Sequence, residues 1–408
     1  MCSFRFVTDH SLTLLGTRLT DWLLKKTVYG QFVSGETPDE IVSAVRKLRA
    51  VGVGPLLAIP MEDDIDSQHQ DADRQFDNNL CSVLDSMNLA YHLQPGGFPM
   101  VQLKLTALMP GTLCAMVSKA CPEPSSRPEV VEAVARALKG GQPLDVAQIF
   151  GSDIPAEMGD QLVKGLQRVA KVCELAVDKQ VIVMVDAEYT YMNPALNLIT
   201  LAMMLNCNTG IPRPPLVFYT YQNYLKATRE VLERDVNFLE SRGAGFAAKM
   251  VRGAYMNKER KSAAMSGLED PVHDTYDATS AAYDSGVAML LNKMAASPSG
   301  KYRMIVATHN EQSAILAVKR MEKLGIRPDE GSVFFGQLMG MADHITCSLG
   351  VNGFLACKSM PYGRVEDTLP YLSRRAQENK AVLEGSRKEH ALLTTELRRR
   401  FRLGSPIK

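Results

Sequence analysis

The sequence of 408 residues has no excess of charge of one sign: 46 Lys and Arg residues accompany 45 Asp and Glu residues, for a net charge of +1. A protein that binds nucleic acid gains much of its affinity from counterion release and needs a basic surplus. The charge balance therefore argues against a nucleic-acid partner. No apolar run approaches the ~20 residues that a transmembrane helix needs.

Cysteine pairs and the common nucleotide and metal motifs are also missing. The eight cysteines show neither a C-x-x-C spacing nor a paired pattern, which is typical of a reduced compartment. No P-loop is present, and no two of the seven histidines form an H-x-x-x-H pair, so we expect no metal site. Gly243-Ala244-Gly245 precedes an apolar run, whereas a dinucleotide fingerprint follows a strand. Any nucleotide-like cofactor must then be held by other loops.

The first residues do not resemble a targeting segment. Asp9 and Asp21 interrupt the apolar stretches, which argues against a secretory signal, and the segment is poor in arginine, which argues against a mitochondrial presequence. If the protein is imported, we expect the targeting segment to be absent from this sequence or unorthodox.

Eight short apolar runs dominate the rest of the chain. Their nearly continuous apolar character is typical of parallel strands that are covered on both faces. The runs lie at 54–60, 101–108, 181–189, 215–222, 246–255, 302–310, 332–340 and 353–363. Helical segments are predicted between them, among others at 161–178, 224–241, 274–295 and 310–324. Eight strand–helix units predict an α/β fold of the (β/α)8 barrel type.

We predict two parts of the chain, an N-terminal helical arm over 1–40 and a barrel over 41–408 that includes a C-terminal helix. A helix is expected near 14–26, and Thr37 is a good N-cap for a second helix with Ile41 and Val45 on one face. The connections 62–100 and 109–150 are long, and each follows a strand. We expect the first to hold an acidic and polar stretch that leads into a helix, and the second to hold a linker and a short helix. Either connection could act as a lid, and a solvated loop is the alternative.

Polar side chains gather within or just after the apolar runs. They are Lys104, Asp186, Glu188, Gln222, Lys249, Arg252, His309, Gln337 and Ser359. The carboxyl ends of the strands of such a barrel converge on one face, where barrel enzymes have their active sites. A purely structural barrel has no need for these residue types at strand ends. Taken alone, however, a carboxylate pair such as Asp186 and Glu188 fits a helix cap or an ion pair equally well.

The stretch 361–379, PYGRVEDTLPYLSRRAQEN, contains two adjacent arginines close to a helix start. Pro370 suits a first helical turn, and Arg374 and Arg375 follow it, where the helix dipole already favours an anion. Guanidinium groups in this position suit a carboxylate ligand. A solvated charged helix face is the alternative interpretation.

YLSRRAQEN resembles the YLxRRxxEN motif of the FAD-dependent proline dehydrogenases. DAE, KMVRGAY, ATHN, FGQLMGM and YLSRRAQEN occur in the order that this family shows, and Lys104 in VQLKLTAL extends the similarity. The resemblance covers most of the chain from Tyr29 onward and is weakest over 62–100 and 109–160. It implies a (β/α)8 barrel with FAD, a quinone as electron acceptor and a mitochondrial location.

The resemblance also implies roles for single residues. Asp186 and Lys249 would be catalytic, Lys249 standing where many bacterial relatives have arginine. The substrate would contact Lys104, Tyr255, Leu338, Ser359, Tyr371, Arg374 and Arg375. FAD would contact Ala187, Gln222, Val251, Arg252, Gly253, Ala254, Thr308, His309 and Gln337. Glu378 and Asn379 would hold the arginine helix from behind.

Ser359 distinguishes two branches of the family. The proline-oxidising relatives have a tyrosine here, whereas serine leaves space and offers a hydroxyl to a 4-hydroxyproline ring. The resemblance therefore implies oxidation of trans-4-hydroxy-L-proline to 1-pyrroline-3-hydroxy-5-carboxylate, with L-proline as the alternative substrate. A clear preference for hydroxyproline over proline requires a hydrogen bond between Ser359 and the ring hydroxyl, because a hydrophobic pocket rejects an added hydroxyl only weakly.

Three further alternatives stay open. A lysine Schiff-base aldolase would use Lys104 or Lys249 without a flavin. A catalytically silent barrel is the second. The third concerns the tail, where the basic stretch 397–403 could contact an anionic membrane surface or could simply complement a helix C-terminus.

Overall fold

The structure, a computed structural model, describes residues 17–59, 72–140, 144–210, 214–297, 300–369, 371–373 and 391–400. Eight parallel strands form a closed barrel in the order of the sequence, which confirms the predicted fold. They are β1 (Val53–Ala58), β2 (Met100–Leu103), β3 (Ile182–Val185), β4 (Val217–Gln222), β5 (Phe246–Val251), β6 (Tyr302–Ala307), β7 (Val333–Leu338) and β8 (Ala356–Pro361). β1 closes the barrel by pairing with β8 from Val53↔Ala356 to Ala58↔Pro361.

The strands are apolar throughout because both of their faces are buried. Alternate side chains point to opposite sides of a strand. One set, for example Met184 and Phe218, forms an apolar cluster inside the barrel. The other set, for example Val183 and Tyr219, packs between the strands and the helices. The absence of polar alternation in the sequence follows from these two buried surfaces.

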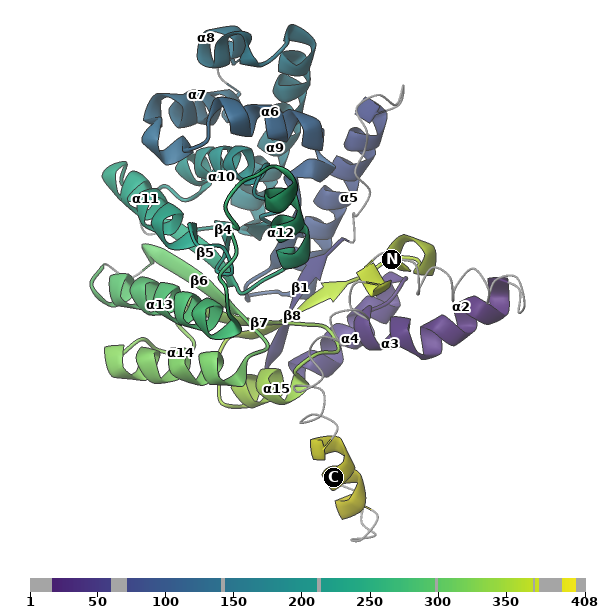
Figure 1. Cartoon of the computed structure of the whole chain (residues 1–408). Helices are drawn as coiled ribbons and strands as arrows, with labels where there is room; N and C mark the ends of the chain where they lie inside the picture. Colours follow the sequence, from purple (N-terminus) through teal and green to yellow (C-terminus); the bar gives the residue numbers. More distant parts are fainter. Residues whose placement is uncertain are drawn as a thin grey trace.

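Helices surround the strands (Figure 1). They are α2 (Thr17–Lys26), α3 (Val28–Phe32), α4 (Pro38–Arg49), α5 (Ala72–Leu93), η1 (Leu105–Ala107), α6 (Gly111–Ala120), η2 (Pro124–Ser126), α7 (Pro128–Leu138), α8 (Val146–Phe150), η3 (Gly151–Asp153), α9 (Ala156–Lys179), α10 (Asn193–Cys207), α11 (Thr228–Ser241), α12 (Met256–Met265), α13 (Tyr276–Ala295), α14 (Glu311–Leu324) and α15 (Asp343–Val351). Residues 365–369, 371–373 and 391–400 are helical as well.

Local sequence signals determine several helix ends. The Thr37 side chain accepts a hydrogen bond from the Glu40 amide, which confirms the predicted N-cap of α4, and the Glu40 side chain completes a capping box there. The Asn310 side chain caps α14 by accepting from the Ser313 amide, and Gly325 ends that helix in the left-handed conformation that glycine adopts without strain. Helix α4 spans residue 41, the predicted boundary between arm and barrel, and that division stays a prediction.

Each of the two long connections contains a helix, as expected. In the first, α5 buries one side, including Phe76, Leu80 and Met87. In the second, α7 buries Val130, Val131, Val134, Ala135 and Leu138 and packs against α9 and α10. These two helices are packed and not solvated loops, because their apolar residues recur at helical spacing and extend the layer outside the strands. A lid role for either connection stays a prediction.

The arm lies against the carboxyl end of β8. The Ser34 amide donates to the Pro361 carbonyl at 2.8 Å, and the Tyr29 hydroxyl donates to the Gly363 carbonyl at 2.7 Å. An apolar cluster, which we call the arm cluster, joins the arm to the segments after β7 and β8. Its buried members are Tyr29, Phe32, Val33, Met341, Val365, Tyr371 and Leu372.

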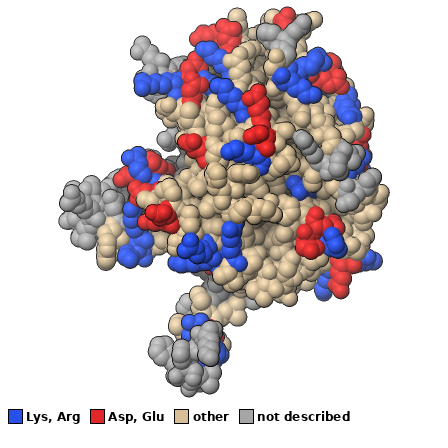
Figure 2. All heavy atoms as spheres, turned by 180° about the vertical axis from the view of Figure 1, so that it is seen from behind, with Lys and Arg blue, Asp and Glu red and all other residues tan. Residues whose placement is uncertain are grey.

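Charged side chains of both signs are mixed on one face of the molecule, in line with the balanced composition. On the face seen in Figure 2, basic and acidic side chains of the described residues alternate in small groups. None of the helices in the described part of the chain has the length and apolar character needed to cross a membrane. The described cysteines are all free thiols, in agreement with the unpaired pattern in the sequence.

The packing of the arm predicts that the arm detaches from the barrel when the side chain of Phe32 is removed. Phe32 is 6% exposed, so Phe32→Ala leaves a cavity in the arm cluster and should release the arm while the barrel stays folded. We expect faster trypsin cleavage after Lys25 and Lys26, with an unchanged circular dichroism spectrum. Trp22→Ala is the control, because that side chain is 57% exposed. Equal cleavage rates for Phe32→Ala and the wild type would contradict this account of the arm.

Candidate functional site

Polar side chains face inward at the carboxyl end of the barrel. Asp186, Lys249 and Ser359 each lie two residues beyond a member of the apolar cluster inside the barrel. Because side chains two apart share one face of a strand, all three point toward the barrel axis. The structure therefore brings together residues that are up to 173 positions apart, 186 to 359, at the mouth of the barrel.

An ion pair joins two of these residues. The Lys249 ammonium donates to Asp186 Oδ1 at 2.5 Å, and the two side chains are 10% and 22% exposed. The Asp186 amide donates to the Leu103 carbonyl at 2.9 Å, which positions the carboxylate between β2 and β3. Loss of either partner would leave a poorly solvated charge, which is costly.

Lys104 supplies a second positive charge at the same end of the barrel. It lies between β2 and η1 and is half-buried. Its ammonium makes no hydrogen bond or ion pair with any residue that the structure describes. A lysine in this position is available to an anionic ligand.

The residues predicted to line the substrate pocket lie in three different parts of the fold. Ser359, 6% exposed, donates a long hydrogen bond of 3.4 Å to Gln102 Oε1 across the barrel. The Tyr255 ring packs on Tyr189, with centroids 4.6 Å apart. Leu338 packs against the arm cluster, to which Tyr371 belongs. Arg374, Arg375, Glu378 and Asn379 lie outside the described residues, so the arginine pair stays a prediction.

Several polar residues hold the loop after β3, and sequence reasoning missed most of them. Asn193 donates to Gln222 Oε1 at 2.9 Å and accepts from the Glu188 amide at 2.7 Å. Gln222 in turn donates to the Glu188 carbonyl at 3.0 Å, and Thr106 donates to the Glu188 carboxylate at 2.6 Å. Only the position of Asn193 before Pro194, at a helix start, could have indicated its role.

Glu259 ties this loop to α12. Its carboxylate, 3% exposed, accepts from the Thr190 amide at 2.9 Å and from the Thr190 hydroxyl at 2.6 Å. In the sequence, Glu259 stands in the charged run KERK, which suggests only a solvated helix face. A buried carboxylate is stable here because both of its oxygens are hydrogen-bonded.

A buried lysine was also missed. The Lys358 ammonium donates to the Leu338 and Met341 carbonyls at 3.2 and 2.5 Å, and pairs with Asp343 at 2.6 Å. It faces outward from β8 and fastens the loop after β7. In the sequence, the occurrence of a lysine within an apolar strand could have indicated this role.

Two residues predicted to bind the cofactor point away from the barrel mouth. The Arg252 guanidinium donates to the hydroxyls of Ser280 and Ser313 on α13 and α14, and lies 5.1 Å from the Tyr276 ring centroid. Gln337 uses both ends of its amide: it donates to the Thr308 carbonyl at 3.1 Å and accepts from the Thr346 hydroxyl at 2.9 Å. Gln337 therefore supports the ends of β6 and β7 instead of projecting into the mouth.

The other predicted cofactor residues surround the mouth. Gly253 and Ala254 are exposed after β5, and Val251 is half-buried. The His309 Nε2 accepts from the Leu338 amide at 3.0 Å, and Ala187 is buried beside the ion pair at the end of β3. Exposed backbone at Gly253, together with the ammonium of Lys249, suits a cofactor that combines a planar ring with negative charge.

Comparison with known proteins identifies relatives over nearly the whole chain. The family model described as proline dehydrogenase matches residues 44–388. Hydroxyproline dehydrogenase from Xenopus laevis is 42% identical, over 98% of this chain and 85% of the relative. The Homo sapiens protein of that name is 41% identical over 98% of this chain and 88% of the relative. Proline dehydrogenase 1, mitochondrial, from Homo sapiens is 42% identical over 60% of this chain and 40% of its own length.

Among solved structures, proline utilization A from Bdellovibrio bacteriovorus superposes with a TM-score of 0.67 at 19% identity, over 89% of this chain. The chain spans only 34% of the length of that protein, and at this identity the similarity concerns the fold alone. The family model and the curated relatives lead to the identification: the chain belongs to the proline dehydrogenase family.

Proposed function

We propose that this protein oxidises trans-4-hydroxy-L-proline to 1-pyrroline-3-hydroxy-5-carboxylate with FAD as its cofactor. The observation that carries the substrate assignment is Ser359, whose small side chain faces into the barrel beside Gln102. Relatives that are about 40% identical over nearly the whole chain carry the name hydroxyproline dehydrogenase, which supports the assignment.

The substrate carboxylate would bind to Lys104, whose ammonium is half-buried at the barrel mouth. Arg374 and Arg375 would complete this receptor. Fixing the carboxylate orients the ring, so that the C4 hydroxyl reaches the inward-facing Ser359 and the carbon beside the nitrogen is presented for oxidation. Such positioning can lower a barrier by several kcal/mol.

The Asp186–Lys249 pair would lie beside the reacting carbon and nitrogen. Lys249 would orient the Asp186 carboxylate through their ion pair, and Asp186 would in turn hold the substrate amine through a hydrogen bond. Tyr255, Leu338 and Tyr371 would surround the ring and exclude water.

The residues at the barrel mouth fit FAD by the chemistry of their donors. Ala187, Gln222, Val251, Gly253, Ala254, Thr308 and His309 would surround it, with Lys249 beside its ring. Arg252 would bind the phosphates of FAD after breaking its hydrogen bonds to Ser280 and Ser313. Gln337 would not contact FAD but would hold Thr308 in place through the hydrogen bond to its carbonyl. When bound, FAD supplies the two-electron oxidation of the C–N bond.

We further propose that the protein works in mitochondria, because its proline dehydrogenase 1 relatives are named as mitochondrial. We also propose that the electrons pass to a quinone. Peripheral membrane contact would then bring the acceptor close. The helix over 391–400 exposes Leu392, Leu393 and Leu397, which supports such a contact.

Steady-state reduction of a soluble quinone analogue tests the function. FAD-loaded protein should be yellow and should show a higher kcat/KM with trans-4-hydroxy-L-proline than with L-proline. A preference for L-proline would reject the substrate assignment. Bound flavin without turnover of either imino acid would favour a silent barrel, and lack of flavin would reject the proposal as a whole.

Two substitutions of Ser359 separate the effect of side-chain size on substrate preference from the effect of the hydroxyl's hydrogen bond. Ser359→Tyr fills the space beside Gln102 and should shift the ratio of the two kcat/KM values toward L-proline. Ser359→Ala keeps the space but removes the hydroxyl, and should lower the hydroxyproline preference by about 2- to 10-fold, the value of one neutral hydrogen bond. If neither variant changes the ratio, Ser359 does not select the substrate.

The role of Lys104 is tested with a substrate that lacks the carboxylate. Lys104→Met should raise the KM for hydroxyproline by about 10- to 100-fold, because it removes a charged hydrogen bond. The same variant should leave turnover of 3-pyrrolidinol unchanged, and its thermal midpoint should equal that of the wild type. Lys139→Met, at the end of α7, is the control for loss of an exposed lysine. Equal losses with both substrates would contradict carboxylate binding by Lys104.

A further inference from the structure

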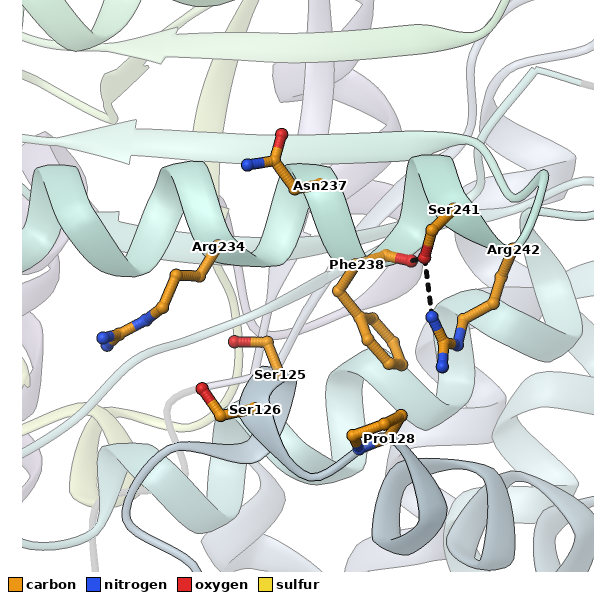
Figure 3. Close-up of a pocket in the computed structure, with 8 residues that line it drawn as sticks. All are labelled: Ser125, Ser126, Pro128, Arg234, Asn237, Phe238, Ser241 and Arg242. Atoms are coloured by element: carbon orange, nitrogen blue, oxygen red, sulfur yellow. Dashed lines mark hydrogen bonds between the residues drawn. The ribbon is translucent and has the colours of Figure 1, made fainter.

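Paired cations occur both on the surface and in the interior of this protein, and they differ in what they hold. In the surface groove between η2 and α11, the Arg242 guanidinium donates to the Ser241 hydroxyl at 2.6 Å, and it pairs with Glu132 at 3.0 Å (Figure 3). Exposed pairs of this kind contribute little free energy. Lys358 of β8 is 1% exposed, and lysine is seldom buried to this degree unless its ammonium is paired.

The Lys358 ammonium binds one short segment of the chain. Its three hydrogen atoms match three acceptors, which are the carbonyls of Leu338 and Met341 and the carboxylate of Asp343. All three acceptors belong to residues 338–343, which join β7 to α15 and which we call the β7–α15 loop. Lys358 therefore fixes this loop at both of its ends.

The position of the ammonium is unfavourable for the helix that follows the loop. Asp343 is the first residue of α15, so the Lys358 ammonium lies at the N-terminus of that helix. A cation is disfavoured there, because the helix dipole places positive charge at this end. Asp343 offsets the repulsion. Stabilisation of α15 therefore does not account for the lysine, since an apolar side chain would avoid the conflict.

The β7–α15 loop contains a residue in a strained conformation. Ala342 has a φ of 53°, in the left-handed region that residues other than glycine seldom adopt. Strain of this kind persists only where surrounding contacts enforce it, and it is concentrated near ligand sites. The hydrogen bond from Lys358 to the carbonyl of Met341, one residue before Ala342, is such a contact.

Leu338 connects Lys358 to the predicted substrate pocket. In the parallel pairing of β7 with β8, Leu338 is in register with Ser359. Residues in register on neighbouring parallel strands point to the same face of the sheet. The side chains of Leu338 and Ser359 are therefore neighbours on the inner face of the barrel. Lys358 lies on the outer face and holds the Leu338 carbonyl at 3.2 Å.

Two further hydrogen bonds join the loop to the site. The Leu338 amide donates to Nε2 of His309, which we assign to the flavin site, at 3.0 Å. The Met339 amide donates to the Ser359 carbonyl, also at 3.0 Å. A change in the position of the loop would therefore be felt by both the substrate pocket and the flavin site.

We propose that Lys358 is a positioning residue for substrate selection. By holding the β7–α15 loop, it keeps the Leu338 side chain beside Ser359, so that the substrate ring is confined and its C4 hydroxyl is directed to the serine. Lys358 touches neither substrate nor cofactor and acts through Leu338. This inference rests on the proposed oxidation of hydroxyproline and names a residue outside the pocket that sets the substrate preference.

Kinetics of the full-length, FAD-loaded protein test this role. Lys358→Met keeps the length of the side chain and removes its charge. We expect the ratio of kcat/KM for trans-4-hydroxy-L-proline to that for L-proline to fall by about 3- to 10-fold, mainly through the KM for hydroxyproline, because only this substrate depends on alignment with Ser359. Lys323→Met, which removes an exposed lysine near the end of α14, is the control and should keep the wild-type ratio.

A double variant separates positioning from a general loss of stability. Leu338→Ala removes the side chain through which Lys358 acts, so Lys358→Met should have little further effect on the ratio in that background. A purely structural lysine would lower the thermal midpoint in both backgrounds and would leave the ratio of the two substrates unchanged.

Hydrogen exchange measures the loop without reference to activity. The amides of Leu338, Met339 and Met341 are hydrogen-bonded and should exchange faster in Lys358→Met, while those of α14 should not change. If Lys358→Met does not fold, Asp343→Asn takes its place, because that side chain is 57% exposed and its loss should be tolerated. The same changes are then expected at a smaller size.

The inference is overturned if a folded variant keeps the wild-type exchange rates in this loop, or if the substrate ratio does not change. Failure of the proposed function has a different signature. Wild-type protein that oxidises neither imino acid would reject that function and the selection role with it, while the exchange rates would still show whether Lys358 holds the loop.

Discussion

Closure of the barrel by β1 and β8 is the constraint on which the rest of the structure depends. These strands are about 300 residues apart in the chain and pair along six consecutive positions. Every loop at the carboxyl ends of the strands is thereby directed to one face. The same pairing places the residues after β8 beside the N-terminal arm, so that Tyr29 and Phe32 belong to one apolar cluster with Tyr371 and Leu372. The segment that leads to the predicted arginine pair is therefore positioned by residues from the opposite end of the chain.

The two faces of each strand differ in function. Inward-facing positions are apolar at the amino ends of the strands and become polar at the carboxyl ends, where Asp186, Lys249 and Ser359 lie. Outward-facing positions contact the helices, and polar groups there, such as Lys358 and Gln337, are used to fasten loops. This division explains why polar residues that look equivalent in the sequence differ in role. One residue of displacement along a strand turns a side chain from the mouth to the helices.

Buried polar groups near the mouth form chains in which each group is satisfied by the next. Glu188, Asn193 and Gln222 hold one another, and Glu259 binds Thr190. Burial of such groups costs free energy unless they are hydrogen-bonded, so these networks hold the loop after β3 in one arrangement.

The sequence by itself determined the architecture. Eight apolar runs, helix caps such as Thr37 and Asn310, and the motif order that resembles the proline dehydrogenases were sufficient, because burial on both faces and capping chemistry act locally. The convergence of Lys104, Asp186 and Lys249 also followed once a barrel was assumed. Only the tertiary structure decided which polar residues support others. Glu259, Asn193 and Lys358 gave no local indication of their partners, and the outward direction of Gln337 and Arg252 depends on packing against α13, α14 and α15.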